Sequence, residues 1–427
     1  MFYKFIQFLL QQFLHFHFDE IKSSNQQAVP KEGPLIIAAS HPNSFLDAII
    51  LAAILKRPLH FLARSDVFAK KWSDFLLRKL NLIPIYRLKE GKDNLHKNEE
   101  TFAACHQILK EGGALLIFAE GVSIGDKLIR PLKKGLGRIA YSYVEQYPNE
   151  KPPKIVACGI NYEHINHFGS KILVGYSETI AWEDLRQNSS SFNAQSLNLL
   201  NKRILAAIKE HSIVVSPEDE KLHQALVELD PCYEQNSLIR KALIAEKIAL
   251  LKKEDPQKYQ ALKQEILKMD KILTPYHLDF QSMKHKVEVN TQDFFLYFLL
   301  WPFALFGLVL NALPFLLGKA IAKRTTQKDP EFYLSVRFTV GSFLWLLWTL
   351  SFTLLLSLMG HAIFILSPLV FYFLGRVYQA NKQRWKLINR LRWIKKIKSN
   401  QGANSGLQEE IRKILKLRTS LGLMPKS

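Results

Sequence analysis

Between residues 34 and 180, short apolar runs alternate with longer segments that are apolar on one helical face. The longer segments predict helices that start at Ser44 and that cover 66–80, 94–111 and 134–147. Strands alternating with helices of this length predict an α/β fold, in which a mostly parallel sheet is flanked by helices on both faces. The runs with the length and composition of buried strands are PLIIAAS (34–40), HFLAR (60–64), IPIYR (83–87), ALLIFAEG (114–121), KIVACGINY (154–162) and KILVGY (171–176).

Two longer apolar runs follow, at residues 294–318 and 338–375, and neither contains Lys, Arg, Asp or Glu. A run of about 18 or more apolar residues is long enough to cross a hydrocarbon core of ~30 Å. The second run would measure about 57 Å as a single helix at ~1.5 Å per residue, which is too long for one crossing. We therefore expect Gly360-His361 to divide it into two helices, and we expect an integral membrane protein.

The charge of the chain agrees with a membrane location. The 58 Lys and Arg exceed the 38 Asp and Glu by 20, which fits either nucleic acid or an anionic membrane as partner. Residues 376–427 carry 14 Lys and Arg but only Glu409 and Glu410, directly after the apolar runs, and Trp385 and Trp393 lie among these cations. This position favours anionic membrane lipid as the partner and not nucleic acid.

The distribution of cations also predicts the membrane topology. The linker 319–337 and the tail are both basic, so the positive-inside tendency places both on the cytoplasmic side. That arrangement requires 294–318 to enter the membrane and return, helped by bends at Pro302, Asn311 and Pro314. Three simple crossings are the alternative. The re-entrant version is the one that the charges favour.

The first 18 residues predict a different kind of membrane element. Lys4, Gln7, Gln11 and His15 form a narrow polar stripe at helical spacing, and aromatic and aliphatic residues fill the rest. The segment is too short and too polar to span, and it lacks the small-residue cleavage site of a signal peptide. An amphipathic helix lying in the membrane interface is expected. An ordinary helix packed on the core is the alternative.

A histidine and an aspartate follow the first predicted strand, in SHPNSFLD (40–47). Ligand sites of parallel sheets lie beyond the carboxyl ends of the strands. Pro42 favours an extended His41, and Asp47 in the first turn of the next helix is able to reach back to the imidazole. An aspartate that accepts from one ring nitrogen leaves the other as a general base for an alcohol. The alternative for Asp47 is helix capping, with Ser44 at the N-cap.

Cations and a Glu-Gly pair follow the later strands at the same expected edge. Arg87 ends the third strand and suits bidentate phosphate binding. Glu120, Gly121 and Ser123 follow the fourth strand, and RPLKKGLGRIA (130–140) then brings further cations, Lys133 and Arg138 among them, to a helix start. These residues predict a phosphate-bearing alcohol as substrate. Three widely spaced cysteines exclude a disulfide scaffold and a zinc ribbon. We expect no metal and no cofactor at this site.

The order of these motifs resembles that of the glycerolipid acyltransferase superfamily, which includes glycerol-3-phosphate and 1-acylglycerol-3-phosphate acyltransferases. The matching residues are His41 with Asp47, Arg87, Glu120-Gly121 in FAEGVS, and the strand IVACGINY. The five residues between His41 and Asp47 resemble the branch of yeast-type glycerol-3-phosphate/dihydroxyacetone-phosphate acyltransferases and their bacterial relatives. The resemblance covers roughly residues 1–180.

The resemblance implies transfer of a fatty acyl group from acyl-CoA or acyl-carrier protein to a hydroxyl of glycerol 3-phosphate or 1-acylglycerol 3-phosphate in phospholipid biosynthesis. His41 would be the general base, Asp47 would orient it, and Arg87 with Glu120-Gly121 would bind the acceptor phosphate. The alternatives are another lysophospholipid acceptor, or a non-catalytic lipid-binding membrane protein of the same fold.

Three departures from the family pattern concern the acceptor more than the reaction. Ala119 replaces the usual proline, Val122-Ser123 lacks the following arginine of many members, and Ala157-Cys158 replaces a proline-bearing block. Lys133 or Arg138 is expected to supply the missing positive charge.

The chain is thus expected to have five parts, with the catalytic domain on the cytoplasmic face of a membrane. They are an interfacial helix (1–18), an α/β acyltransferase domain (19–180), a charged helical region (181–290), transmembrane or re-entrant hairpins (291–378) and a basic cytoplasmic tail (379–427).

Overall fold

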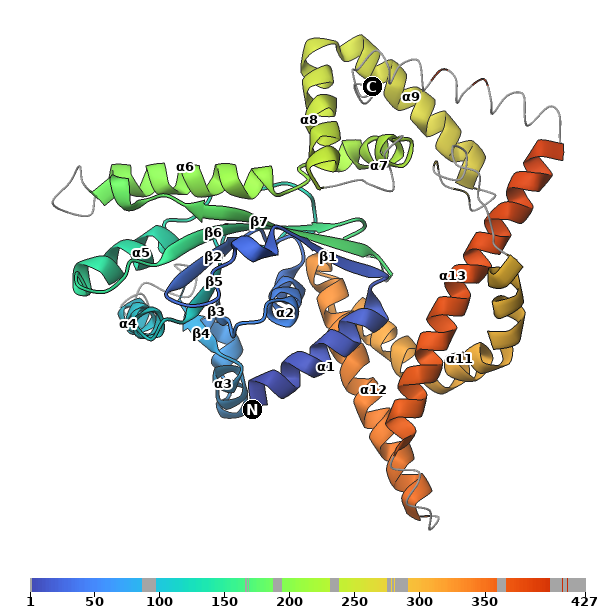
Figure 1. Ribbon diagram of the computed structural model, residues 1–427, viewed down its shortest axis with the longest axis horizontal. Helices are drawn as coiled ribbons and strands as arrows, with labels where there is room; N and C mark the ends of the chain where they lie inside the picture. The colour runs from blue at the N-terminus through green and yellow to red at the C-terminus, as the bar shows by residue number, and fades with distance from the viewer. Residues whose placement is uncertain are drawn as a thin grey trace. The chain divides into compact units, whose positions relative to one another are not determined.

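The computed structural model forms two compact units. The first comprises Met1–Val214 with Thr326–Ser335, and the second Val215–Thr325 with Val336–Ser427. The structure describes residues 2–86, 97–165, 167, 169–186, 194–230, 238–274, 278, 280, 291–358, 366–399, 409 and 413. Figure 1 shows the elements of both units, coloured from the N-terminus to the C-terminus.

Seven strands of the described residues form one sheet in the first unit, in the order β1-β7-β6-β2-β5-β3-β4. The neighbours from β6 to β4 are parallel, whereas β7 is antiparallel to β6, and β1 is parallel to β7. The predicted fold class, a mostly parallel sheet flanked by helices, is confirmed. The strands are β1 (Glu20–Ser24), β2 (Leu35–Ala39), β3 (His60–Arg64), β4 (Leu82–Ile85), β5 (Ala114–Phe118), β6 (Lys154–Tyr162) and β7 (Lys171–Ile180).

Strand β2 is the centre of the sheet. Leu35 pairs with Ala114 of β5 on one side and with Lys154 of β6 on the other, and all five residues of β2 are buried. A strand buried on both faces reads as a continuous apolar run, which is why LIIAA was recognisable in the sequence. Strand β1 (EIKSS) was missed because one apolar residue in five gives no strand pattern.

Helices cover both faces of the sheet. α4 (Lys97–Lys110), α5 (Gly135–Gln146) and α6 (Ala194–Glu210) bury their apolar residues against β2, β5 and β6. α1 (Phe2–His17) and α2 (Ser44–Ile54) lie on the opposite side from α6 (Figure 1). α3 (Lys71–Lys79) lies between β3 and β4 in the chain.

Helix α6 lies in the part of the chain that was assigned to the charged helical region. Its buried residues, Leu197, Leu200, Ile204 and Ile208, recur at helical spacing and join the core of the sheet. This apolar stripe outweighs the charged surface in deciding where the helix packs. The first unit accordingly extends to Val214.

The two glutamines in the polar stripe of α1 face α2, whereas Lys4 and His15 of the same stripe are exposed. Gln7 donates hydrogen bonds to the carbonyls of Ala52 (2.7 Å) and Leu55 (2.8 Å), and Gln11 donates one to that of Ala53 (2.6 Å). These acceptors lie at the end of α2, where helix carbonyls lack intrahelical partners. Phe5 and Phe8 are left 59% and 56% exposed. The interfacial position of α1 stays a prediction.

The second unit contains a small helical core and longer apolar helices. α7 (Glu220–Glu228), α8 (Leu238–Glu254) and α9 (Pro256–Leu273) share one apolar cluster. α11 (Thr291–Thr325), α12 (Tyr333–Leu358) and α13 (Ser367–Ser399) follow. Among the described helices, Thr291–Thr325 and Pro330–Leu358 are long and apolar enough to cross a membrane, by length and composition alone.

Residues 294–318 belong to one continuous helix, α11, with Pro302 and Pro314 inside it. Proline removes a helix hydrogen bond and bends the helix, and α11 is visibly curved in Figure 1. The helix α11 is therefore curved but is not interrupted between residues 294 and 318. The choice between re-entry and crossing stays a prediction, as does the cytoplasmic placement of the tail.

A single buried asparagine joins the three long helices. The Asn311 side-chain amide of α11 donates to the carbonyls of Gly307 (2.8 Å) and Phe371 of α13 (3.2 Å). Its Oδ1 accepts from the indole N–H of Trp345 of α12 at 2.5 Å. In apolar surroundings such a shared amide stabilises helix packing, because few other partners exist there.

We predict that Asn311→Ala and Trp345→Phe each lower the melting temperature in detergent, and that their effects are not additive. The coupling between such partners in membrane proteins averages about 0.6 kcal/mol and reaches about 1.7 kcal/mol. A double-mutant cycle on thermal unfolding measures this coupling. Additive effects would show that the hydrogen bond contributes nothing to packing.

Candidate active site

His41 and Asp47 meet at the carboxyl end of β2. The His41 Nδ1–H donates to Asp47 Oδ2 at 3.0 Å, and the ring stacks on Phe118 with centroids 3.8 Å apart and planes 13° apart. The His41 side chain is 17% exposed and that of Asp47 is fully buried. Since Nδ1 carries the proton, Nε2 is the ring nitrogen free to accept one.

Asp47 accepts two further hydrogen bonds. The backbone N–H of Asn43 donates to Oδ2 at 2.7 Å, and the Tyr162 hydroxyl donates to Oδ1 at 2.8 Å. Burial, reinforced by the negative charge of Asp47, raises the pKa of Tyr162 well above its usual value. Tyr162 therefore keeps its proton and remains a donor.

The helix start differs in one respect from the expected one. Asn43, not Ser44, is the N-cap residue of α2, and its side chain makes no capping bond. Asp47 supplies the cap instead, by accepting the Asn43 N–H with the same oxygen that holds His41. The capping role and the contact with the imidazole, which the sequence left as alternatives for Asp47, are therefore both present.

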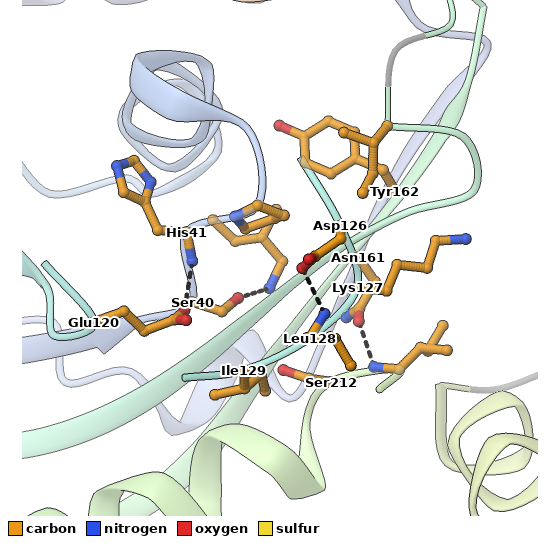
Figure 2. Close-up of a pocket in the computed structure, with 14 residues that line it drawn as sticks. Ser40, His41, Glu120, Asp126, Lys127, Leu128, Ile129, Asn161, Tyr162 and Ser212 are labelled. Carbon is orange, nitrogen blue, oxygen red and sulfur yellow. Dashed lines mark hydrogen bonds between the residues drawn. The ribbon is translucent and has the colours of Figure 1, made fainter. Parts of the chain in front are cut away.

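Glu120 bridges the loops that follow β2 and β5. Its Oε1 accepts the His41 N–H at 3.1 Å and its Oε2 accepts the Arg130 N–H at 2.8 Å, and Figure 2 shows it beside Ser40 and His41. Burial raises the pKa of Glu120, against the lowering effect of these two hydrogen bonds. Gly121 follows with φ +69°, a conformation that suits glycine. The Glu120 carboxylate therefore holds the backbone of His41 and of Arg130 in place.

Two polar contacts order the rest of the loop after β5. Ser123 Oγ accepts the N–H of Ser44 at 2.6 Å. Arg130 donates two guanidinium hydrogen bonds to Asp126, at 2.7 and 2.5 Å. Burial raises the pKa of Asp126, but hydrogen bonds from Arg130 and Leu128 outweigh it, so the pKa is lowered overall. The Arg130 guanidinium is therefore engaged in an ion pair with Asp126.

The predicted cations are not all gathered at the site. The Lys133 side chain is exposed and lies over Gly121, where an added Cβ would be 3.1 Å from its Cγ. Arg138 is exposed on α5, and no hydrogen bond in the described part of the chain joins it to His41 or Glu120. Arg87 lies outside the described residues.

A pocket opens beside His41. Figure 2 shows Ser40, His41 and Glu120 on one side, with Tyr162 and Ser212 from other segments. The Ser212 hydroxyl is buried and has no hydrogen-bond partner among the described residues. The lining mixes polar groups with the apolar side chains of Leu128, Ile129, Ile160, Ile165 and Ile213.

Sequence reasoning missed Tyr162, although the signal was available. Tyr162 ends the strand KIVACGINY, and β6 is the parallel neighbour of β2. Reading the residue at the end of each strand, rather than the residues after it, would have placed its hydroxyl near Asp47.

The fold and this pair define the class: an α/β domain with a His-Asp pair at the carboxyl edge of a mostly parallel sheet. Residues 20–161 match the family model named Acyltransferase. The match lies within the first unit and includes His41, Asp47 and Glu120.

Curated relatives are similar over this region. The 1-acyl-sn-glycerol-3-phosphate acyltransferase of Bacillus subtilis is 28% identical over 121 residues, which are 28% of this chain and 56% of that protein. Glycerol-3-phosphate O-acyltransferase 2 of Saccharomyces cerevisiae is 35% identical over 83 residues, 19% of this chain and 11% of that protein. The chain thus spans about half the length of the bacterial relative and a small part of the yeast one.

Among solved structures, the chain is similar to the 1-acyl-sn-glycerophosphate acyltransferase PlsC of Thermotoga maritima. The TM-score is 0.33 at 15% identity, over 48% of this chain and 78% of that one.

Tyr162→Phe is expected to destabilise the protein, because it leaves one oxygen of a fully buried carboxylate without a donor. The cost of such a loss is about 1.5–3 kcal/mol. Tyr176→Phe is the matched control, because the Tyr176 hydroxyl is also buried but has no partner in the described residues. Thermal unfolding in one detergent compares the two variants. Equal melting temperatures would contradict the role of the Tyr162–Asp47 bond.

Proposed function

We propose that the protein is a membrane glycerolipid O-acyltransferase. It transfers a fatty acyl group from acyl-CoA or acyl-carrier protein to a hydroxyl of glycerol 3-phosphate or 1-acylglycerol 3-phosphate. The observation that carries the proposal is the His41–Asp47 pair, held at 3.0 Å beside a pocket in an acyltransferase-family domain.

The reaction follows from the free nitrogen of His41. Nε2 takes the proton of the acceptor hydroxyl as its oxygen attacks the thioester carbonyl carbon. The tetrahedral intermediate then collapses, the C–S bond breaks, and the leaving thiolate takes the proton back from the imidazolium. Asp47 stabilises that imidazolium and fixes the ring.

Direct attack by the acceptor agrees with the surroundings of His41. An acyl-enzyme mechanism would need a serine or cysteine nucleophile hydrogen-bonded to the imidazole. Within the described residues, no serine or cysteine makes that hydrogen bond. Ser40 Oγ instead accepts the N–H of Ile160 at 2.9 Å. Burial raises the pKa of the Cys158 thiol well above its usual value, which disfavours a thiolate nucleophile.

The proposed acceptors share a phosphate near the reacting hydroxyl, and both occur in the names of the relatives. We assign Lys133 to that phosphate because its side chain lies over Gly121, directly after the carboxylate that holds the His41 backbone. Arg87, from the family pattern, is proposed as a second cation. We do not assign Arg130 to the phosphate, because its guanidinium is already paired with the Asp126 carboxylate.

The membrane location is part of the same proposal. The two long apolar helices support an integral membrane protein, and the basic linker and tail support a catalytic domain on the cytoplasmic face. Phe5 and Phe8, exposed on α1, are apolar side chains of the kind that enter the interface.

His41→Ala is expected to lower kcat by ~10²–10⁴, the usual contribution of a general base. Purified protein is assayed with acyl-CoA or acyl-carrier protein and a panel of acceptors: glycerol 3-phosphate, 1-acylglycerol 3-phosphate and other lysophospholipids. His15→Ala, an exposed histidine on α1, is the control. Unchanged turnover in His41→Ala would refute the mechanism. Lipid binding without turnover of any acceptor would favour a non-catalytic lipid-binding protein.

Lys133→Met is expected to raise KM for the phosphate-bearing acceptor by about 10-fold or more, because a charge-assisted hydrogen bond is lost while the aliphatic stem over Gly121 is kept. KM for the thioester donor should not change. Arg138→Met makes the same charge change on α5, which begins after Lys133, and should have the smaller effect. A larger effect at Arg138 would move the phosphate site onto α5.

A further inference from the structure

A segment from far along the chain completes the turn that carries His41. Residues 326–335 belong to the first unit, although α11 precedes them in the chain and α12 begins within them. The 3-10 turn η9 (Pro330–Phe332) packs against α2, and Glu331 lies against Gly125 of the loop after β5. Leu334 and Ser335 have no exposed surface.

The Ser335 hydroxyl hydrogen-bonds to this turn both as a donor and as an acceptor. Its hydroxyl donates to the carbonyl of Asn43 at 2.9 Å and accepts the N–H of Leu46 at 3.2 Å. The Leu46 N–H belongs to the first turn of α2, where backbone donors have no intrahelical partner. One buried hydroxyl therefore satisfies a carbonyl and an amide of the same turn.

The carbonyl that Ser335 binds belongs to a peptide bond whose C=O and N–H are both hydrogen-bonded to side chains. Ser335 holds the C=O of the peptide between Asn43 and Ser44, and Ser123 accepts its N–H at 2.6 Å. Ser44 has φ +47°, which is unfavourable for a residue with a side chain. Such a conformation persists only where the surroundings fix it.

The same turn aims the catalytic carboxylate. The N–H of Asn43 donates to Asp47 Oδ2, the oxygen that accepts from His41. Asn43 is itself fully buried, and its side-chain amide donates to the carbonyl of Ile165 at 2.8 Å. A rotation of the turn that the loss of Ser335 permits would therefore move a donor of Asp47.

We propose that Ser335 is a positioning residue for the His41–Asp47 pair, so that the start of α12 supplies part of the active site. The inference rests on the proposed function. The family match ends at residue 161, so this contact comes from outside the matched domain. Ser335 touches no reacting atom and acts through the backbone of residues 43 to 46.

The kinetic test uses the full-length protein in detergent. Ser335→Ala should lower kcat about tenfold and leave KM for donor and acceptor within about twofold, because the base is misaligned while the pocket and Lys133 are unchanged. Ser335→Thr keeps the hydroxyl and should recover most of the rate. Ser342→Ala is the matched control: Ser342 is buried on α12, its hydroxyl has no partner in the described residues, and kcat should equal that of the wild type.

The same substitution made in His41→Ala protein separates a positioning role of Ser335 from a general effect on folding. In His41→Ala protein, adding Ser335→Ala should not reduce the residual rate further, since the pair through which Ser335 acts is already lost. An equal tenfold loss in both backgrounds would overturn the proposal, as would a wild-type kcat in Ser335→Ala.

Hydrogen exchange supplies a readout that does not depend on turnover. Ser335→Ala should speed exchange in a peptide covering residues 43–47 about tenfold, whereas Ser342→Ala should not. If the wild type acylates no acceptor, the proposed function fails and exchange alone decides whether Ser335 holds the turn. Unchanged exchange in Ser335→Ala would overturn the proposal in that case too.

Discussion

A fully buried carboxylate is the constraint around which the site is built. Asp47 has no exposed surface, and a buried charge is tolerated only when hydrogen bonds replace its water. His41, Asn43 and Tyr162 supply three donors, from the end of β2, the turn and the end of β6. The turn must adopt one conformation for all three bonds to form together. Glu120 and Ser123 then fix that turn from the loop after β5.

The parts of this arrangement that the sequence predicted are those encoded locally. The buried strands β2 and β6 were visible as continuous apolar runs, and His41 and Asp47 lie six residues apart at one strand end. Tyr162 was missed because its partner is distant in sequence and only the strand order places them together. Ser335 left no signal, because a serine at the start of an apolar helix looks like an ordinary cap.

Polar side chains in apolar surroundings were the least predictable from pattern. Gln7 and Gln11 looked like the water-facing stripe of an interfacial helix, yet they bond to the last carbonyls of α2. Asn311 looked like a site where the chain bends, yet it links α11 with Trp345 and Phe371. A hydropathy pattern records which residues avoid lipid or core. It does not record whether water or another polar group satisfies them.

Asp47 has two roles, one at the start of α2 and one at His41, so the two members of the pair differ in what they say about catalysis. One oxygen of Asp47 caps the start of α2 and holds His41, so a protein without activity would still need this carboxylate for its fold. Asp47 alone therefore serves the fold as much as catalysis, and it is the bond to His41 that gives the carboxylate a catalytic role. His41 is different, because its ring stacks on Phe118 and, among the described residues, its ring is hydrogen-bonded through Nδ1 and not through Nε2. A phenyl ring would fill that space without placing a polar nitrogen there. The chemical argument for acyl transfer consequently rests on the imidazole, and the carboxylate supports it by fixing which nitrogen is free.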